Sequence, residues 1–159
     1  MTSDQSRELI VTIRSLVVGA DAGSELYRVC RALRDGVSWY DWVGFYLAVP
    51  SRRLLVLGPF SGEPTEHLRI PYGAGICGQA AEQRETFVVP DVRSQSNYLA
   101  CSIKTRAEVV VPVFHEEEFV GELDIDSHTH DPFTDVDTDL LHQVAGMAAP
   151  LVASILPER

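Results

Sequence analysis

Basic residues are scarce in this sequence of 159 residues: 13 arginines and lysines stand against 23 aspartates and glutamates, which gives a formal net charge of −10. That excess of negative charge would repel the phosphates of nucleic acids and of anionic lipid surfaces. No basic run or strip along the chain offsets it. The composition therefore argues against nucleic-acid binding and against attachment to an acidic membrane.

Long hydrophobic runs are also missing. The apolar stretch Leu9–Val11, between Arg7 and Arg14, is too short for the core of a signal peptide. The longest apolar tract, Val144–Leu156, is too short to span a bilayer and contains Pro150. We therefore expect a cytoplasmic protein. In that reducing compartment the 3 cysteines are not expected to form a structural disulfide framework, so any disulfide would be transient.

Length and a hydrophobic content of 45% suit one domain, residues 1–159, with its own core. Changes in hydrophobic period along the chain predict helices that alternate with short strands. Consecutive hairpins imply an α+β fold with a mainly antiparallel sheet and helices from both chain ends on one face. The predicted helices are Ser6–Leu16, Ser24–Asp35, Gly75–Arg84 and a C-terminal helix opened by a capping box at Thr134 and Asp137, and the predicted strands are Trp42–Val49, Leu54–Phe60, Thr86–Val89, Glu108–His115 and Glu118–Ser127.

An ordered set of thiols and acids is the most informative feature of the chain: Cys77 and Cys101, then Glu108, Asp124 and Asp126. One thiol can attack an electrophilic sulfur or oxygen, and a second thiol can resolve the product. Acidic side chains nearby can hold an ammonium group or supply a proton. The set indicates redox chemistry on a small cationic molecule.

Several segments in chain order carry a family resemblance. They are Trp42–Leu47, Leu57–Gly62, Ile70–Gly78, Tyr98–Cys101, Glu108–Pro112 and Gly121–Ser127. Together they resemble the GAF domain of free methionine-(R)-sulfoxide reductases, from about Trp42 to the C-terminal helix. A generic GAF domain would not carry both cysteines and all three acids.

The resemblance implies a GAF-like antiparallel sheet flanked by N- and C-terminal helices, and the reduction of free L-methionine (R)-sulfoxide to methionine. It also implies that Cys101 is the nucleophile, Cys77 a resolving thiol and a thioredoxin-like protein the final reductant. We expect neither a cofactor nor a metal. Helices at both chain ends are compatible with a homodimer.

The sequence departs from the family pattern at three places. Members with three cysteines carry a resolving cysteine shortly before the segment that corresponds to Ile70–Gly73, and residues 63–67 here contain no thiol. The usual His-Ile-Ala-Cys-Asp is replaced by Tyr98–Ser102, and Ala107 stands where a serine is common. The resolving thiol is therefore Cys77 or an external thiol.

Strand alternation is compatible with a substrate pocket of this kind. Trp42 and Tyr46 share one face of their strand, with Gly44 between them as a floor without a side chain, and Asp124 and Asp126 share one face of theirs. An aromatic wall opposite an acidic wall suits an amino acid whose thioether packs on a ring and whose ammonium is held by carboxylates.

Buried acids that lie close together also have raised pKa values. One of Glu108, Asp124 and Asp126 could therefore stay protonated and donate a proton to the sulfoxide oxygen. The pattern does not distinguish which of them does so.

Each of these residues also has a purely structural interpretation. Cys77, near a helix start, could pack as a small apolar residue, as we expect of Cys30 on the apolar stripe of its helix. Trp42 and Tyr46 could be core aromatics. Asp124 and Asp126 could be turn acids that end their strand. For Cys101 the position within the long loop 91–105 favours a functional role.

Other ligand classes fit poorly. A calcium loop from Asp124 would need glycine at Thr129 and glutamate at Asp135. His128 and His130, with Asp131, could bind a transition metal but are typical of a solvated turn. Neither a Walker sequence nor a dinucleotide glycine motif is present.

Two other classes of protein remain as alternatives. One is a non-catalytic GAF module that binds a small ligand or senses redox state. Since the 159 residues contain no kinase, cyclase or DNA-binding segment, such a sensor would need a separate partner to transmit its signal. The other is a dimeric scaffold built on the flanking helices, which would explain the apolar helices but not Glu108, Asp124 and Asp126.

Overall fold

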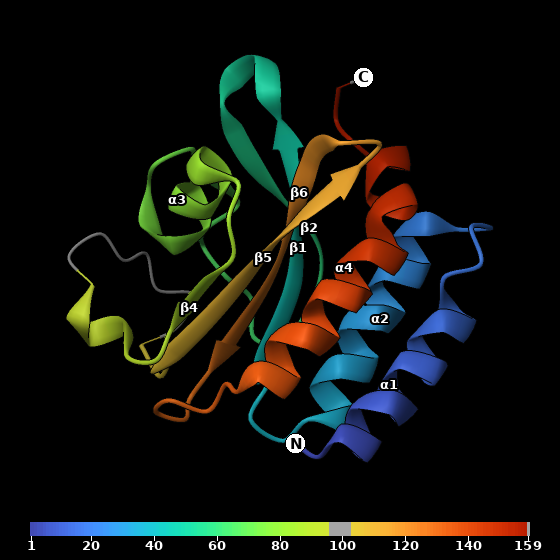
Figure 1. Cartoon of the computed structure of the whole chain (residues 1–159). Helices are drawn as coiled ribbons and strands as arrows, with labels where there is room; N and C mark the ends of the chain where they lie inside the picture. Colours follow the sequence, from blue (N-terminus) through green and yellow to red (C-terminus); the bar gives the residue numbers. More distant parts are fainter. Residues whose placement is uncertain (96–102, 159) are drawn as a thin grey trace.

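An antiparallel sheet forms the centre of the molecule, as the computed structural model shows for residues 1–95 and 103–158 (Figure 1). It has six strands in the order β3-β2-β1-β6-β5-β4. The helices are α1 (Ser3–Leu16), α2 (Ala22–Gly36), α3 (Gly75–Gln83) and α4 (Asp135–Ser154), and the strands are β1 (Trp42–Val49), β2 (Leu54–Ser61), β3 (Arg69–Pro71), β4 (Phe87–Val89), β5 (Ala107–His115) and β6 (Glu118–Ser127). The predicted α+β class and antiparallel pairing are confirmed.

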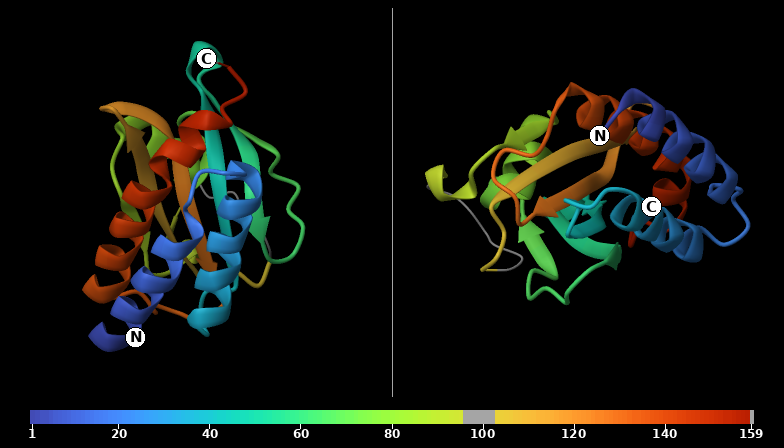
Figure 2. Two further views of the ribbon diagram at one scale, coloured as in Figure 1. Left: turned by 90° about the vertical axis from the view of Figure 1, so that its right-hand side faces the viewer. Right: turned by 90° about the horizontal axis from the view of Figure 1, so that it is seen from below.

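The sheet separates two layers. Helices α2 and α4 pack against one face and α1 packs on both of them, whereas α3 lies on the other face (Figures 1 and 2). Alternation along β1 explains this, because Val43 and Phe45 enter the core with the terminal helices while Trp42 and Tyr46 enter a second core with α3. Cys30 of α2 lies in the first core, fully buried, as predicted.

Strand β3 was not predicted, because its three residues are too few for a periodic signal. It forms by pairing with β2, and of its residues only Ile70 is buried. Helix α1 also begins earlier than predicted, at Ser3, because Thr2 and Gln5 form a capping box.

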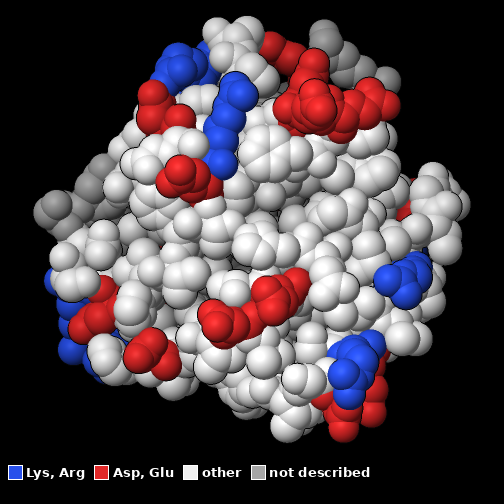
Figure 3. Space-filling view, viewed as in Figure 1, with Lys and Arg blue, Asp and Glu red and all other residues white. Residues whose placement is uncertain are grey.

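The surface is acidic but not uniformly so. On the face shown in Figure 3, acidic side chains form several separate groups, with basic side chains beside some of them and uncharged surface between. Within the described residues, no helix has the length and apolar character needed to cross a bilayer.

A buried aspartate holds the start of α4 against the segment between α2 and β1. The predicted capping box is present, with Thr134 N donating to Asp137 Oδ2 at 2.8 Å. The other oxygen, Oδ1, accepts from the Tyr40 hydroxyl at 2.7 Å and from Trp39 Nε1 at 3.4 Å. Burial, and then the contact with Asp137, raise the pKa of Tyr40. One carboxylate thus satisfies donors from two segments distant in sequence.

We predict that Asp137→Ala lowers the free energy of unfolding by roughly 2 to 4 kcal/mol, because it removes a cap and leaves the buried Tyr40 hydroxyl without its acceptor. Urea denaturation monitored by circular dichroism measures the change. The matched control is Asp139→Ala on the exposed side of the same helix, which should change stability by less than about 0.5 kcal/mol. Equal losses in the two variants would contradict this role for Asp137.

Candidate functional site

The pairing of β1 with β6 brings aromatic and acidic side chains together. Trp42 lies opposite Asp126, Gly44 opposite Asp124, and Tyr46 opposite Glu122. Directly paired residues point to the same face of a sheet, so these side chains are neighbours on the face that α3 covers. The predicted aromatic and acidic walls are therefore adjacent strands of one surface rather than opposite walls.

Strand β5 adds a further acid, since Glu108 lies opposite Asp126. The relative exposure of Glu108, Glu122, Asp124 and Asp126 is only 3%, 0%, 0% and 1%. Asp124 and Asp126 lie inside β6, so their interpretation as turn acids is wrong. We call these four side chains the acid cluster.

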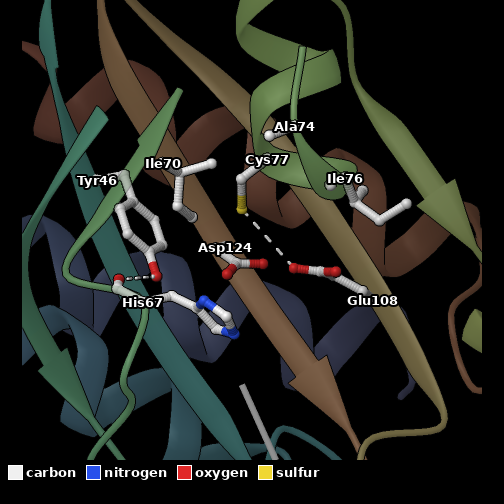
Figure 4. A pocket seen from close by; sticks show the side chains of 9 residues that line it. Tyr46, His67, Ile70, Ala74, Ile76, Cys77, Glu108 and Asp124 are labelled. Atoms are coloured by element: carbon white, nitrogen blue, oxygen red, sulfur yellow. Dashed lines mark hydrogen bonds between the residues drawn. The ribbon is translucent and has the colours of Figure 1, made fainter. Parts of the chain in front are cut away.

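Helix α3 places Cys77 above the acid cluster. Gly75 begins the helix with φ of 64°, a conformation that few other residues adopt. Gly78 lies against the Pro71 carbonyl, where a Cβ would approach within 2.5 Å of the oxygen. The resulting close approach puts Cys77 Sγ 3.7 Å from Glu108 Oε2 (Figure 4). Cys77 thus contacts the acid cluster as well as the second core.

A small cavity separates α3 from the sheet at this point. Tyr46, His67, Cys77, Glu108 and Asp124 contribute to its lining (Figure 4). Its volume of about 10 Å³ is enough for roughly one water molecule. Three of the predicted substrate-binding residues, Tyr46, Glu108 and Asp124, therefore share this cavity with one predicted thiol.

Burial controls the protonation of the acid cluster. It raises the pKa of Glu108 well above its ordinary value, and the charges of Asp124 and Asp126 add to the rise. It also raises the pKa of Glu122, with a further contribution from Asp124. Burial raises the pKa of Asp124 too, but close polar contacts with Glu108 and Cys77, and the imidazole of His67, oppose that rise. Among the acids that line the cavity, Glu108 is the best suited to hold a proton.

Gly44 does not form an open floor between Trp42 and Tyr46, so this prediction is wrong. The Trp42 ring lies over Gly44, so that a Cβ there would overlap it. Trp42 stacks on Phe60 with ring centroids 5.5 Å apart, and its Nε1 donates to Glu63 O at 3.0 Å. Gly44 thus makes room for the indole. Trp42 lines a separate depression of about 70 Å³, together with Asp126.

Sequence reasoning missed His67 and Glu122. The Tyr46 hydroxyl donates to His67 O at 3.0 Å, and the imidazole points toward Asp124 in the cavity (Figure 4). Strand alternation could have found Glu122, which shares its face with Asp124. For His67 the loop sequence offers no comparable signal. Cys101, the predicted nucleophile, lies outside the described residues.

The histidines considered for a transition metal do not converge. His128 Nδ1 lies 3.6 Å from Asp41 Oδ1, whereas His130 Nδ1 lies 3.9 Å from Asp91 Oδ2. A metal-competent arrangement is present elsewhere in the described residues, where ligand atoms of Cys77, Glu108 and Asp124 lie within 4.8 Å of one another.

Comparisons with known proteins agree with this fold. The family model of the GAF domain matches residues 17–151. GAF domain-containing protein A of Dictyostelium discoideum is 36% identical over 142 residues, 89% of this chain and 88% of that protein. The free methionine-R-sulfoxide reductase of Saccharomyces cerevisiae is 34% identical, over 79% of this chain and 69% of that protein. The structure of free methionine-R-sulfoxide reductase from Neisseria meningitidis in complex with its substrate is 35% identical, with a TM-score of 0.88 over 96% of this chain and 90% of that one.

We predict that Glu122→Gln makes the protein less sensitive to rising pH. In the unfolded chain Glu122 ionises above about pH 4.3, but in the folded protein it keeps its proton to higher pH. The folded state therefore binds more protons in that window, and the stability of the wild type falls as pH rises through it.

The stability of Glu122→Gln relative to the wild type should therefore increase by roughly 1 kcal/mol or more between about pH 5 and about pH 8. Urea denaturation at the two pH values measures this change. Glu118→Gln, at the exposed start of the same strand, is the control and should follow the wild type. Identical pH dependence in Glu122→Gln and wild type would contradict the assignment.

Proposed function

The chain belongs to the GAF domain family, in its free methionine-R-sulfoxide reductase group, and on this premise we propose that it reduces free L-methionine (R)-sulfoxide to methionine. The observation that carries the proposal is the buried cavity in which Cys77 meets Glu108 and Asp124. A thiol beside carboxyl groups of different proton affinity suits a reaction that needs both a reductant and a proton.

The acid cluster supports a substrate that carries an ammonium group. Buried carboxylates are costly unless a positive charge or hydrogen-bond donors accompany them. The ammonium of a free amino acid would supply a positive charge and hydrogen-bond donors to Asp124 and its neighbours. The cavity has the volume of about one water molecule, so the lining side chains have to move apart when substrate binds.

We assign the chemical steps as follows. The Cys101 thiolate attacks the sulfoxide sulfur, and Glu108 donates a proton to the sulfoxide oxygen as its bond to sulfur breaks. The oxygen then bonds to Cys101 Sγ as the bond between Cys101 Sγ and the substrate sulfur breaks, so that Cys101 becomes a sulfenic acid and the substrate leaves as methionine. The Cys77 thiol then condenses with the sulfenic acid, releasing water and forming a disulfide that a thioredoxin-type dithiol reduces.

We propose that the chain forms one GAF domain over residues 1–159, acts in the cytoplasm and pairs as a homodimer through its terminal helices. The exposed Val11, within α1, and Val18, just beyond its C-terminal end, support a partner on that side. A sensory GAF module is less favoured, because binding alone does not require a thiol against a protonated acid.

Substrate form tests the proposal directly. We expect reduction of free L-methionine (R)-sulfoxide, with at least a hundredfold loss for the same sulfoxide inside a peptide, which lacks the ammonium that the acid cluster holds; such a loss corresponds to about 2.7 kcal/mol. Both rates are measured by incubating stereochemically pure substrates with the protein and a thiol reductant and by following the released methionine by chromatography. The (S) epimer is the control for the handedness of the pocket. Equal turnover of free and peptide-bound sulfoxide would refute the proposal.

The thiols provide a second test. Cys101→Ser should abolish methionine formation because it removes the attacking atom. Cys77→Ser should still release one methionine per chain in a single turnover, and recycling by thioredoxin should slow far more than recycling by dithiothreitol. Rapid-quench kinetics and mass spectrometry of the substrate-treated protein measure these effects.

Cys30→Ser is the matched control, since Cys30 is buried in the other core and should affect only stability. Full activity of Cys101→Ser would refute Cys101 as the nucleophile, whereas a wild type that binds the substrate without methionine release or oxidation of Cys101 would favour the ligand-binding module.

A further inference from the structure

Three of the four carboxyl groups of the acid cluster lack an ion-pair partner among the described residues. None of the salt bridges among the described residues involves Glu108, Glu122 or Asp124. Both carboxyl oxygens of Asp124 are buried and accept no hydrogen bond of good geometry, and Asp124 points into the cavity beside Cys77 (Figure 4). A buried acceptor of this kind calls for a proton or a cation.

The donors around the cavity are arranged as a metal ion would need them. Cys77 Sγ, a Glu108 carboxyl oxygen and an Asp124 carboxyl oxygen lie within 4.8 Å of one another, and the sulfur is 3.7 Å from Glu108 Oε2. In a tetrahedral zinc site, Zn–S of about 2.3 Å and Zn–O of about 2.0 Å place sulfur and oxygen about 3.5 Å apart. Small side-chain movements would therefore complete the geometry.

The donor set favours zinc over the common hard cations. A thiolate is a soft ligand, which Mg²⁺ and Ca²⁺ avoid in favour of six or more oxygens. Zn²⁺ accepts sulfur, oxygen and nitrogen in the same shell. His67 lines the same cavity and can supply the fourth ligand. A cavity of about 10 Å³ also accepts a single ion without the side-chain movement that an amino acid requires.

We propose that Cys77, Glu108 and Asp124 form a Zn²⁺-binding site and that bound zinc inhibits the protein. The ion would occupy the position of the substrate ammonium and would hold the Cys77 thiol as a ligand, so that it cannot resolve a sulfenic acid. The inhibitory part of this inference rests on the proposed function. The binding site itself does not, because it follows from the donor geometry alone.

Metal binding to the reduced full-length protein tests the site without any activity measurement. Co²⁺ serves as a spectroscopic substitute, because a cobalt–thiolate bond gives a near-ultraviolet charge-transfer band. We expect wild type and Cys30→Ser to bind one Co²⁺ with this band and to lose it when Zn²⁺ is added. Cys101→Ser should keep the band, and Cys77→Ser should lose it. Retention of the band in Cys77→Ser, or no stoichiometric binding by wild type, would overturn the inference.

Glu108→Gln is a second variant that leaves the thiol in place. Competition with a chromophoric chelator should show zinc affinity lowered by roughly tenfold or more, since even loss of a residue that supports a ligand costs 10 to 100-fold. Glu118→Gln, on the surface, should bind zinc as the wild type does, and circular dichroism verifies that each variant is folded. Unchanged zinc affinity in Glu108→Gln would overturn the assignment of that ligand.

A competition experiment separates the site from the inhibition. Free methionine sulfoxide should weaken zinc binding to the wild type, and zinc should inhibit methionine release from it. If zinc binds through Cys77 and Glu108 while methionine sulfoxide leaves its affinity unchanged, the site is supported and the shared ammonium position is overturned. If the zinc-loaded protein releases methionine as fast as the zinc-free protein, the inhibitory role is overturned.

Discussion

Carboxyl groups buried between the sheet and α3 are the constraint on which the rest of the structure depends. Glu108, Glu122, Asp124 and Asp126 project from adjacent strands into a layer closed to water. Burial of several ionised carboxylates side by side would cost several kcal/mol for each ion. Protonation, the contact of Glu108 with Cys77 and a cationic ligand are the means available to reduce that cost. A pocket of this kind is poised to bind a cation and to transfer a proton.

The opposite face of the sheet provides the stability that this arrangement requires. There Val43, Phe45, Leu123 and Ile125 are fully buried with residues of the terminal helices, and each such side chain stabilises the fold by about 1.5 to 3 kcal/mol. Asp137 fixes the start of α4 to the loop before β1 through Tyr40. The same strands therefore carry an apolar core on one side and a polar site on the other.

The cavity relates the proposed reaction to the proposed metal site. Both use Cys77, Glu108 and Asp124, and they differ in the cation that occupies the cavity. An ammonium group leaves the Cys77 thiol free to react, whereas a zinc ion takes it as a ligand. The imidazole of His67 lies near Asp124, from the loop that precedes β3, so either cation would lie beside it (Figure 4).

Local patterns in the sequence determined the elements other than β3 and the faces of the longer strands. Alternation was sufficient to place Trp42 with Tyr46 and Asp124 with Asp126, and spacing was sufficient to place Cys30 in the helical core. These predictions succeeded because period and capping depend on residues a few positions apart.

Only the tertiary structure decided which of these residues meet. The pairing of β1 with β6 made the aromatic and acidic walls adjacent, and the turn into α3 brought Cys77 to Glu108. Tertiary packing also places the Trp42 ring over Gly44 and His67 in the lining of the cavity. Contacts between segments distant in the chain depend on register and packing, and these also set the burial that decides which acid keeps its proton. No local pattern encodes them.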